Sequence, residues 1–286
     1  FYELGLGEPV PISAYHNLGV DDLMARVISR FDSTPTAPTP EADMGLAIVG
    51  RANVGKSMLL NSITGQQRAI VNPTPGTTRD PVDTLITHNE STFLLIDTAG
   101  LRRRGKIEPG IERYGALRSV RAIDRAHVSI LVLDASELAA SQDTHIASYI
   151  LDSHKGVVLA VNKWDLAEGI GLTKKDALQK IRERFAFAAY APVRFVSALQ
   201  GTGTDELLDT ARDVFQQWSK GVPRYDLRRT ILNAMARHPP ASTGRTALKI
   251  YGVAQDGTSP PSFTFYVNRS SMVHFSYQRY LENMLR

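Results

Sequence analysis

Residues 50–57 read Gly-Arg-Ala-Asn-Val-Gly-Lys-Ser, and this octapeptide constrains the fold more than any other feature of the chain. An apolar run at residues 46–49 precedes it, and a helix-like run begins at Met58. A glycine-rich turn between a strand and a helix frees backbone N–H groups to surround phosphate oxygens. In this pattern Lys56 reaches the outer phosphates and the Ser57 hydroxyl binds Mg²⁺. The sequence therefore predicts a loop that binds a nucleoside triphosphate.

A polar tetrapeptide, Asn162-Lys163-Trp164-Asp165, follows the apolar run 157–161 and indicates which base is bound. A short apolar run is typical of a buried parallel strand, and open α/β sheets bind ligands at the carboxyl ends of such strands. There the Asp165 carboxylate can accept hydrogen bonds from N1–H and the exocyclic amine of guanine, a donor pair that adenine lacks. A later strand ends in Phe195-Val196-Ser197-Ala198, whose small residues let backbone N–H groups approach the guanine oxygen. These segments predict guanine specificity.

Two further segments indicate a switch that senses the third phosphate. An apolar run ends at Asp97, which can hold Mg²⁺ through water, and the N–H of Gly100 can meet the γ-phosphate only while that phosphate is present. The segment 75–80 reads Pro-Gly-Thr-Thr-Arg-Asp, and we expect Thr78 rather than Thr77 to give a second hydroxyl contact to Mg²⁺.

Together these motifs resemble those of the Der (EngA) family of GTPases, and the resemblance covers nearly the whole chain. Members of this family carry two G domains in tandem and then a KH-like domain, and this chain is similar to the second G domain and the KH-like domain. Ala52 and Met58 stand where the family usually has Pro and Ser or Thr, but neither change removes a phosphate or metal ligand. The segments that match are residues 50–57, 75–80, 97–107, 162–165 and 238–283.

The resemblance implies a GTP-hydrolysing switch that acts in assembly of the large ribosomal subunit. It implies a cytoplasmic, monomeric protein with GTP or GDP, Mg²⁺ and K⁺ as cofactors, and with ribosomal RNA or the large subunit as partner rather than a membrane or DNA. Leu101 follows Gly100 where many regulatory GTPases place a water-orienting Gln, and a Leu cannot orient water by hydrogen bonding. Hydrolysis is then either slow or aided by another group. The resemblance implies that this group is K⁺, held partly by Asn53. The alternative is that Asn53 only caps backbone groups of the loop.

The motifs and the resemblance together give a set of expected site residues. The expected nucleotide contacts are Gly50, Arg51, Ala52, Asn53, Val54, Gly55, Lys56, Ser57, Met58, Asp97, Thr98, Ala99, Gly100, Leu101, Asn162, Lys163, Asp165, Ser197, Ala198 and Leu199. The residues expected to act in hydrolysis are Lys56, Asn53, Thr78 and Gly100. The expected Mg²⁺ ligands are Ser57, Thr78 and Asp97.

Pattern changes along the 286 residues predict four parts. Residues 1–32 repeat features of residues 195–208 without the phosphate loop, and we interpret them as the C-terminal remnant of a first G domain that binds no nucleotide. Residues 33–43 form a Pro/Thr linker. Residues 44–220 alternate apolar runs with helical patterns, the helices being near residues 56, 112, 142, 174 and 204. This alternation predicts an α/β domain with a doubly wound, mostly parallel sheet, as in P-loop GTPases. Residues 221–286 have an α-β-β-α order, with a helix near 227–236, strands near 246–254 and 262–268 and a final helix from Ser270, which resembles a smaller α+β KH-like domain, here incomplete.

Composition sets limits on the function. The chain has no cysteine, which excludes disulfides and thiolate metal sites, and no run of eighteen apolar residues. Residues 221–286 hold nine Lys and Arg against three Asp and Glu, a net charge of +6, which favours contact with RNA phosphates. That segment has no Gly-x-x-Gly, so it either docks on folded ribosomal RNA, senses the G domain, or presents only a solvated basic face.

Three other functions are compatible with parts of the sequence. One is a ribosomal GTPase of the Era kind with a single G domain. A second is a non-catalytic RNA-binding scaffold that holds GDP. A third is an ATP-dependent kinase, which Asp165 disfavours.

Overall fold

The computed structural model of the chain describes residues 10–13, 19–20, 22–23, 26, 42–66, 68–70, 83–98, 119–240, 242–243 and 246–286. The chain divides into two compact units, Phe1–Pro40 and Glu41–Arg286. In the first unit, the N–H of Leu23 donates to the carbonyl of Gly19 at 3.1 Å and closes a helical turn. The turn lies where the sequence indicates the last helix of a G-domain remnant, and the remnant itself stays a prediction.

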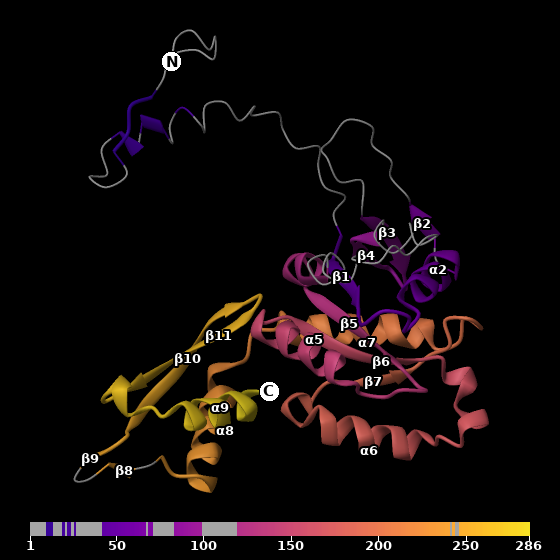
Figure 1. Cartoon of the computed structure of the whole chain (residues 1–286). Helices are drawn as coiled ribbons and strands as arrows, with labels where there is room; N and C mark the ends of the chain where they lie inside the picture. The colour runs from indigo at the N-terminus through magenta and orange to yellow at the C-terminus, as the bar shows by residue number, and fades with distance from the viewer. Residues whose placement is uncertain are drawn as a thin grey trace. The chain divides into compact units, whose positions relative to one another are not determined.

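The second unit is built on a seven-stranded sheet with the order β2-β3-β4-β1-β5-β6-β7 (Figure 1). Strands β2, β3 and β4 pair antiparallel, and every other neighbouring pair is parallel. The predicted fold class, a mostly parallel α/β sheet, is confirmed. The strands are β1 (Met44–Val49), β2 (Arg68–Ile70), β3 (Thr84–His88), β4 (Ser91–Ile96), β5 (Val128–Asp134), β6 (Gly156–Asn162) and β7 (Val193–Phe195).

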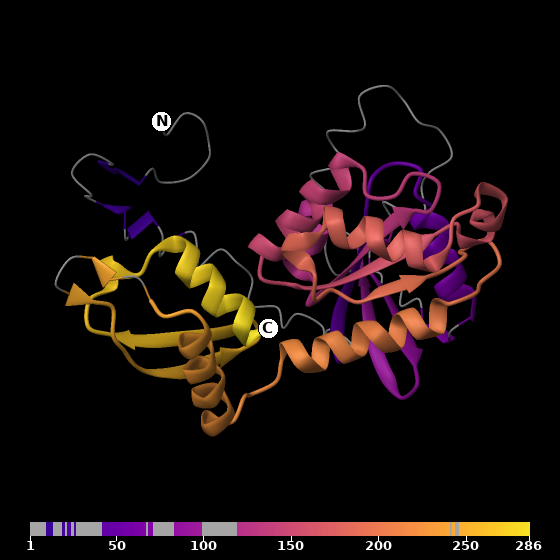
Figure 2. The same ribbon diagram turned by 90° about the horizontal axis from the view of Figure 1, so that it is seen from below.

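Helices cover both faces of this sheet, as Figures 1 and 2 show. The longer helices in the described part of this lobe are α2 (Lys56–Gln66), α5 (Ser141–Asp152), α6 (Lys174–Arg184) and α7 (Thr204–Trp218). Short 3₁₀ turns lie at Trp164–Leu166, Glu168–Ile170 and Ala186–Ala188. A helix that the sequence predicts near residue 112 lies outside the described residues.

Alternate residues of the same strands supply two separate hydrophobic cores. Leu46 and Ile48 of β1 pack with α2 and α7, whereas Ala47 and Val49 pack with α5 and the parts of the chain beside it. Successive side chains of a strand point to opposite faces, so a strand that is apolar throughout is buried on both sides. Strands held in this way place the loops at their carboxyl ends on a rigid base.

A smaller lobe, residues 222–286, comes after α7. It has the two helices and the long hairpin expected from the sequence, and a short β8–β9 pair that the sequence did not indicate lies between the first helix and the hairpin. Its elements are α8 (Arg224–Arg237), β8 (Ser242–Thr243), β9 (Thr246–Ala247), β10 (Ile250–Thr258), β11 (Pro261–Val267) and α9 (Phe275–Leu285). Leu227 and Ile231 of α8 and Leu281 of α9 pack with Val253 of β10, so both helices lie on the same face of the β10–β11 hairpin. The final helix begins later than the predicted Ser270, because residues 270–272 form a 3₁₀ turn before it.

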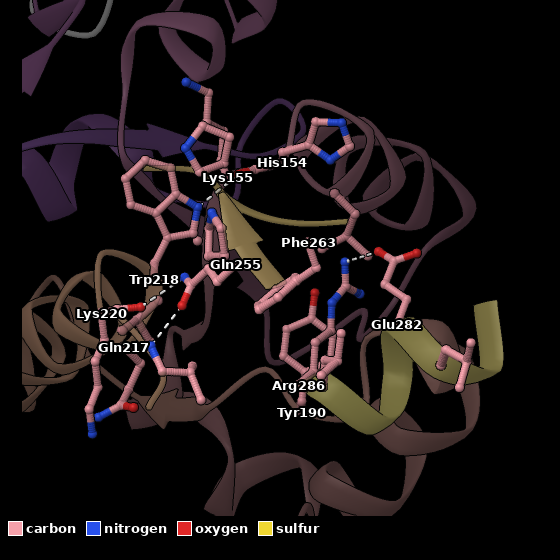
Figure 3. A pocket seen from close by; sticks show the side chains of 18 of the residues that line it. His154, Lys155, Tyr190, Gln217, Trp218, Lys220, Gln255, Phe263, Glu282 and Arg286 are labelled. Carbon is pink, nitrogen blue, oxygen red and sulfur yellow. Dashed lines mark hydrogen bonds and ion pairs between the residues drawn. The ribbon is translucent and has the colours of Figure 1, made fainter. Parts of the chain in front are cut away.

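The linker between the two lobes is held by Gln255 of β10 (Figure 3). Its side chain accepts from the N–H of Val222 at 2.7 Å and donates to the carbonyl of Lys220 at 3.2 Å. Just before the linker, the Nε1–H of Trp218 donates to the carbonyl of His154 at 2.8 Å. These bonds fix where the small lobe leaves the large one.

A cavity of about 1100 Å³ lies beside this linker, lined by residues of both lobes. At one wall Arg286 pairs with Glu282 at 2.7 Å and lies 4.8 Å from the ring centroid of Tyr190 (Figure 3). The phosphate loop does not line this cavity. Among the described residues, no helix is long and apolar enough to cross a bilayer.

Candidate functional site

Five polar segments meet at one edge of the large sheet. Strands β1, β4, β5, β6 and β7 run parallel to their neighbours, so their carboxyl ends lie on the same side. These ends lead into Gly50, Asp97, Asp134, Asn162 and Ser197. Ligands of open α/β sheets bind at this edge, so the topology brings the sequence-predicted residues of the described segments together.

The phosphate loop has a backbone that requires its two glycines. Gly50 has a φ of 147° and Gly55 a φ of 95°, both in the region that L side chains rarely adopt. A Cβ on Gly50 would lie 2.6 Å from the carbonyl oxygen of Val132, and a Cβ on Gly55 would lie 2.3 Å from Nδ2 of Asn162. The loop can therefore pack against β5 and β6 only because neither position carries a side chain.

Lys56 begins α2 and is held by the loop itself. Its Nζ donates to the carbonyl of Gly50 at 2.6 Å and to that of Arg51 at 2.5 Å, and only 7% of the residue is exposed. A buried ammonium fixed in this way gives the loop a positive charge at a constant position. This placement suits the role expected for Lys56 toward the outer phosphates.

The exposed part of the loop carries Ala52 and Asn53, and Met58 is exposed in the first turn of α2. Asn53 has a φ of 64°, in the left-handed region that Asn tolerates better than most residues. Within the described part of the chain, its side chain forms no hydrogen bond. That observation disfavours the alternative in which Asn53 caps the loop.

Arg51 fastens the loop to the segment after β5, a role that the sequence did not indicate. Its guanidinium donates to Oε2 of Glu137 at 2.6 Å and to the carbonyl of Glu137 at 3.0 Å. Its Nε lies 3.4 Å from Oδ2 of Asp143, a carboxylate with no exposed surface. Burial raises the pKa of Asp143 to about 6, although Arg51 opposes that shift.

The raised pKa of Asp143 gives a testable dependence of stability on pH. Burial favours the protonated form in the fold, so this contribution is fully present below the ordinary pKa of 3.8 and is lost as the pH rises through about 6. Asp143→Asn keeps a neutral side chain, and the variant is expected to gain stability relative to the wild type between pH 4 and pH 7. Urea unfolding of both proteins across that range measures the difference, and parallel curves would contradict the assignment.

Asn162 ties the phosphate loop to the base-binding end of the site. Its Nδ2 donates to the carbonyl of Val54 at 2.8 Å, and its Oδ1 accepts from the N–H of Ala198 at 3.0 Å. The residue is 1% exposed, so both bonds are shielded from water. One amide side chain thus fixes two predicted nucleotide-binding segments relative to each other.

The predicted base-reading carboxylate is also held in place. The Ser197 hydroxyl donates to Oδ1 of Asp165 at 2.5 Å, and the N–H of Gln200 donates to the Ser197 hydroxyl at 3.2 Å. Ser197 is 1% exposed, whereas Leu199 in the same loop is 70% exposed. The Asp165 carboxylate therefore has a fixed orientation, and the loop beside it is open to solvent. Both features suit a site that recognises the edge of a flat base.

Asp134 is a residue of the site that the sequence analysis missed. Its Oδ2 accepts from Nζ of Lys163 at 2.6 Å, and its Oδ1 accepts from the Ser136 hydroxyl at 2.6 Å. Burial alone would raise the pKa of Asp134, but the bonds from Lys163 and Ser136 lower it below its ordinary value. Asp134 thus positions Lys163. The one sequence signal is an acidic residue that directly follows the apolar run 130–133.

The described residues of the predicted Mg²⁺ site carry oxygen donors. Ser57 is the second residue of α2, and Asp97 follows β4 with a φ of 57° and its N–H bonded to Oδ1 of Asp83 at 3.0 Å. Thr98 is buried, and its hydroxyl lies 2.9 Å from that of Thr84. Thr77, Thr78, Ala99, Gly100 and Leu101 lie outside the described residues, so their predicted roles stay predictions.

A hydroxyl and a carboxylate suit Mg²⁺, which binds few protein oxygens and takes its other ligands from phosphates and water. No cluster of three or more His, Cys, Asp or Glu occurs among the described residues. The donors present therefore fit Mg²⁺ bound together with a nucleotide rather than a metal held by protein alone.

Comparison with known proteins agrees with this geometry. Residues 45–163 match the family model described as 50S ribosome-binding GTPase, and residues 222–286 match the model described as KH-domain-like of EngA bacterial GTPase enzymes, C-terminal. Over its whole length the chain is 46% identical to GTPase Der of Chloroflexus aggregans and 48% identical to GTPase Der of Thermomicrobium roseum. It spans 64% and 63% of the lengths of these two relatives.

Proposed function

We propose that this chain, which belongs to the Der (EngA) family of GTPases, binds and hydrolyses GTP at the strand-end site and uses the nucleotide state to control contact with ribosomal RNA. The observation that carries the nucleotide assignment is the pair of bonds from Asn162 to Val54 and Ala198. They hold a phosphate loop and a base loop in one rigid frame. Asp165 in that frame selects guanine.

The residues of the strand-end site divide between phosphate chemistry and base binding. Lys56 supplies positive charge where negative charge grows between the β- and γ-phosphates, and a preorganised charge costs no rearrangement at the moment of reaction. Ser57 and Asp97, with Thr78, would hold Mg²⁺, which neutralises phosphate charge when bound. Lys163, held by Asp134, lies beside the base-reading residue and steadies that end of the site.

The proposed location is the cytoplasm, and the chain is proposed to act as a monomer. Its proposed partner is ribosomal RNA of the large subunit. Two observations support this proposal: the net charge of +6 on residues 221–286, and the family description of residues 45–163 as a 50S ribosome-binding GTPase. Basic surface binds phosphate backbones by releasing counterions, so the affinity should fall steeply with salt.

Base choice tests the nucleotide assignment. Asp165→Asn replaces an acceptor with a side chain that can donate, so the variant should lose affinity for GTP and gain it for xanthosine triphosphate. A bidentate base contact gives about 1–3 kcal/mol of discrimination, or roughly 5- to 150-fold in relative affinity. Competition with a fluorescent GDP analogue measures the change.

The matched control is Asp152→Asn, a change at the end of α5 away from the strand-end loops. It should leave both affinities unaltered. A tenfold preference for GTP over the xanthine nucleotide in Asp165→Asn would show that another residue reads the base.

A further inference from the structure

The small lobe presents one helix face that is both aromatic and basic. Tyr225, Arg228, Arg229 and Leu232 of α8 are spaced i, i+3, i+4 and i+7, so they share one face. All four are exposed, with 73% of Tyr225 and 54% of Leu232 accessible. The opposite face carries the buried residues that pack on the β10–β11 hairpin, so this outward stripe does not contribute to the lobe's core.

Positive charge predominates on the helix that carries this face. Helix α8 holds Arg224, Arg228, Arg229 and Arg237 against a single acidic residue, Asp226. Asp226 pairs with Arg229 at 3.0 Å, and within the described part of the chain Arg224 and Arg228 form no ion pair. Positive side chains without acidic neighbours favour a polyanionic partner.

Arg229 also orients the aromatic ring of this face. Its guanidinium carbon lies 5.6 Å from the ring centroid of Tyr225, within the range of a cation–π contact. An exposed ring held beside a guanidinium is a surface on which an unpaired base can stack, while Arg228 and Arg224 reach the flanking phosphates.

We propose that the α8 face, defined as Tyr225, Arg228, Arg229 and Leu232, binds single-stranded RNA by stacking and phosphate contact. This rests on the proposed RNA-binding function and assigns it to a surface. Binding of this kind does not depend on a Gly-x-x-Gly clamp, a motif that residues 221–286 lack. A second copy of the chain is a poorer occupant, because two faces of like charge repel each other.

The test uses the full chain and a fluorescently labelled 15-nucleotide single-stranded RNA of mixed sequence, followed by anisotropy. Tyr225→Ala is expected to weaken binding about 10-fold, since base–aromatic stacking contributes strongly to such affinities. The double variant Arg224→Gln with Arg228→Gln should weaken binding further and lower the slope of log affinity against log salt by about 1.4, or 0.7 for each lost phosphate contact.

Matched controls use similar residues elsewhere. Tyr266→Ala removes a tyrosine that is 57% exposed on β11, and Arg182→Gln with Arg184→Gln removes two exposed arginines at the end of α6. Both controls should bind RNA as the wild type does. All variants change exposed residues, and unaltered GDP affinity and melting temperature confirm that each one is folded.

The outcomes separate the two proposals. If the wild type binds no RNA probe, both the RNA-binding function and this surface fail. If the wild type binds and the α8 variants bind equally well, or if only Tyr266→Ala weakens binding, the RNA-binding function stands and the α8 surface is wrong. A dimer of the wild type that the α8 variants abolish, without loss of RNA affinity, would assign the face to a second copy instead.

Discussion

Replacing Lys56 by alanine is expected to lower GTP turnover by at least about 10²-fold, the loss seen when a preorganised donor to a developing negative charge is removed. Lys56 is buried and bonded to the carbonyls of Gly50 and Arg51, whereas the other cation of the loop, Arg51, is engaged with Glu137 and Asp143. Single-turnover phosphate release at saturating GTP measures the effect on the chemical step.

Asn61→Ala is the matched control, since Asn61 is exposed on the same helix and lies outside the expected nucleotide contacts. Its turnover should equal that of the wild type. If Lys56→Ala retained turnover within threefold of the wild type at saturating GTP, the proposed role of the lysine in stabilising phosphate charge would be wrong.

GTP turnover is expected to be much faster in K⁺ than in Na⁺ at equal ionic strength. Leu101 cannot orient water, so the charge between the β- and γ-phosphates calls for another cation, and the exposed Asn53 side chain is the proposed ligand. Arginine fingers supply about 10³–10⁵ in rate, and even a partial substitute should be evident. K⁺ fits this role better than Na⁺ because its larger radius lets it bridge more widely spaced oxygens.

The variant for this test is Asn53→Gly. Glycine adopts the φ of 64° found at this position without strain, whereas alanine would disturb the loop as well as remove the amide. The variant should lose most of the difference between K⁺ and Na⁺ while its GDP affinity changes little. Equal rates of the wild type in the two salts would refute the K⁺ mechanism and leave the GTPase assignment standing.

The sequence predicted the family and the fold class, both now confirmed, because local patterns encode them. Runs such as residues 157–161 are apolar throughout, which requires burial on both faces of a sheet, and a parallel sheet brings the ends of such runs to one edge. Motif spacing then places Asn162 and Ser197 at that edge.

The sequence could not indicate the contacts that hold the site residues in place. Asp134 ends β5 and Lys163 directly follows the neighbouring β6, 29 positions further along the chain, and Arg51 meets Glu137 across 86 positions. No local spacing rule connects such pairs, since each depends on strand order and on side-chain direction. The start of α9 was missed for a local reason: the 3₁₀ turn at residues 270–272 has the same polar, helix-like composition as a first helical turn.

We expect nucleotide state in the large lobe to govern contact with ribosomal RNA. Co-sedimentation of the chain with purified large ribosomal subunits, with a non-hydrolysable GTP analogue or with GDP, tests it most directly. Coupling between two sites typically changes affinity about 5- to 150-fold, so we expect a difference in that range between the two nucleotides. Equal co-sedimentation with both nucleotides, or none with either, would contradict the account.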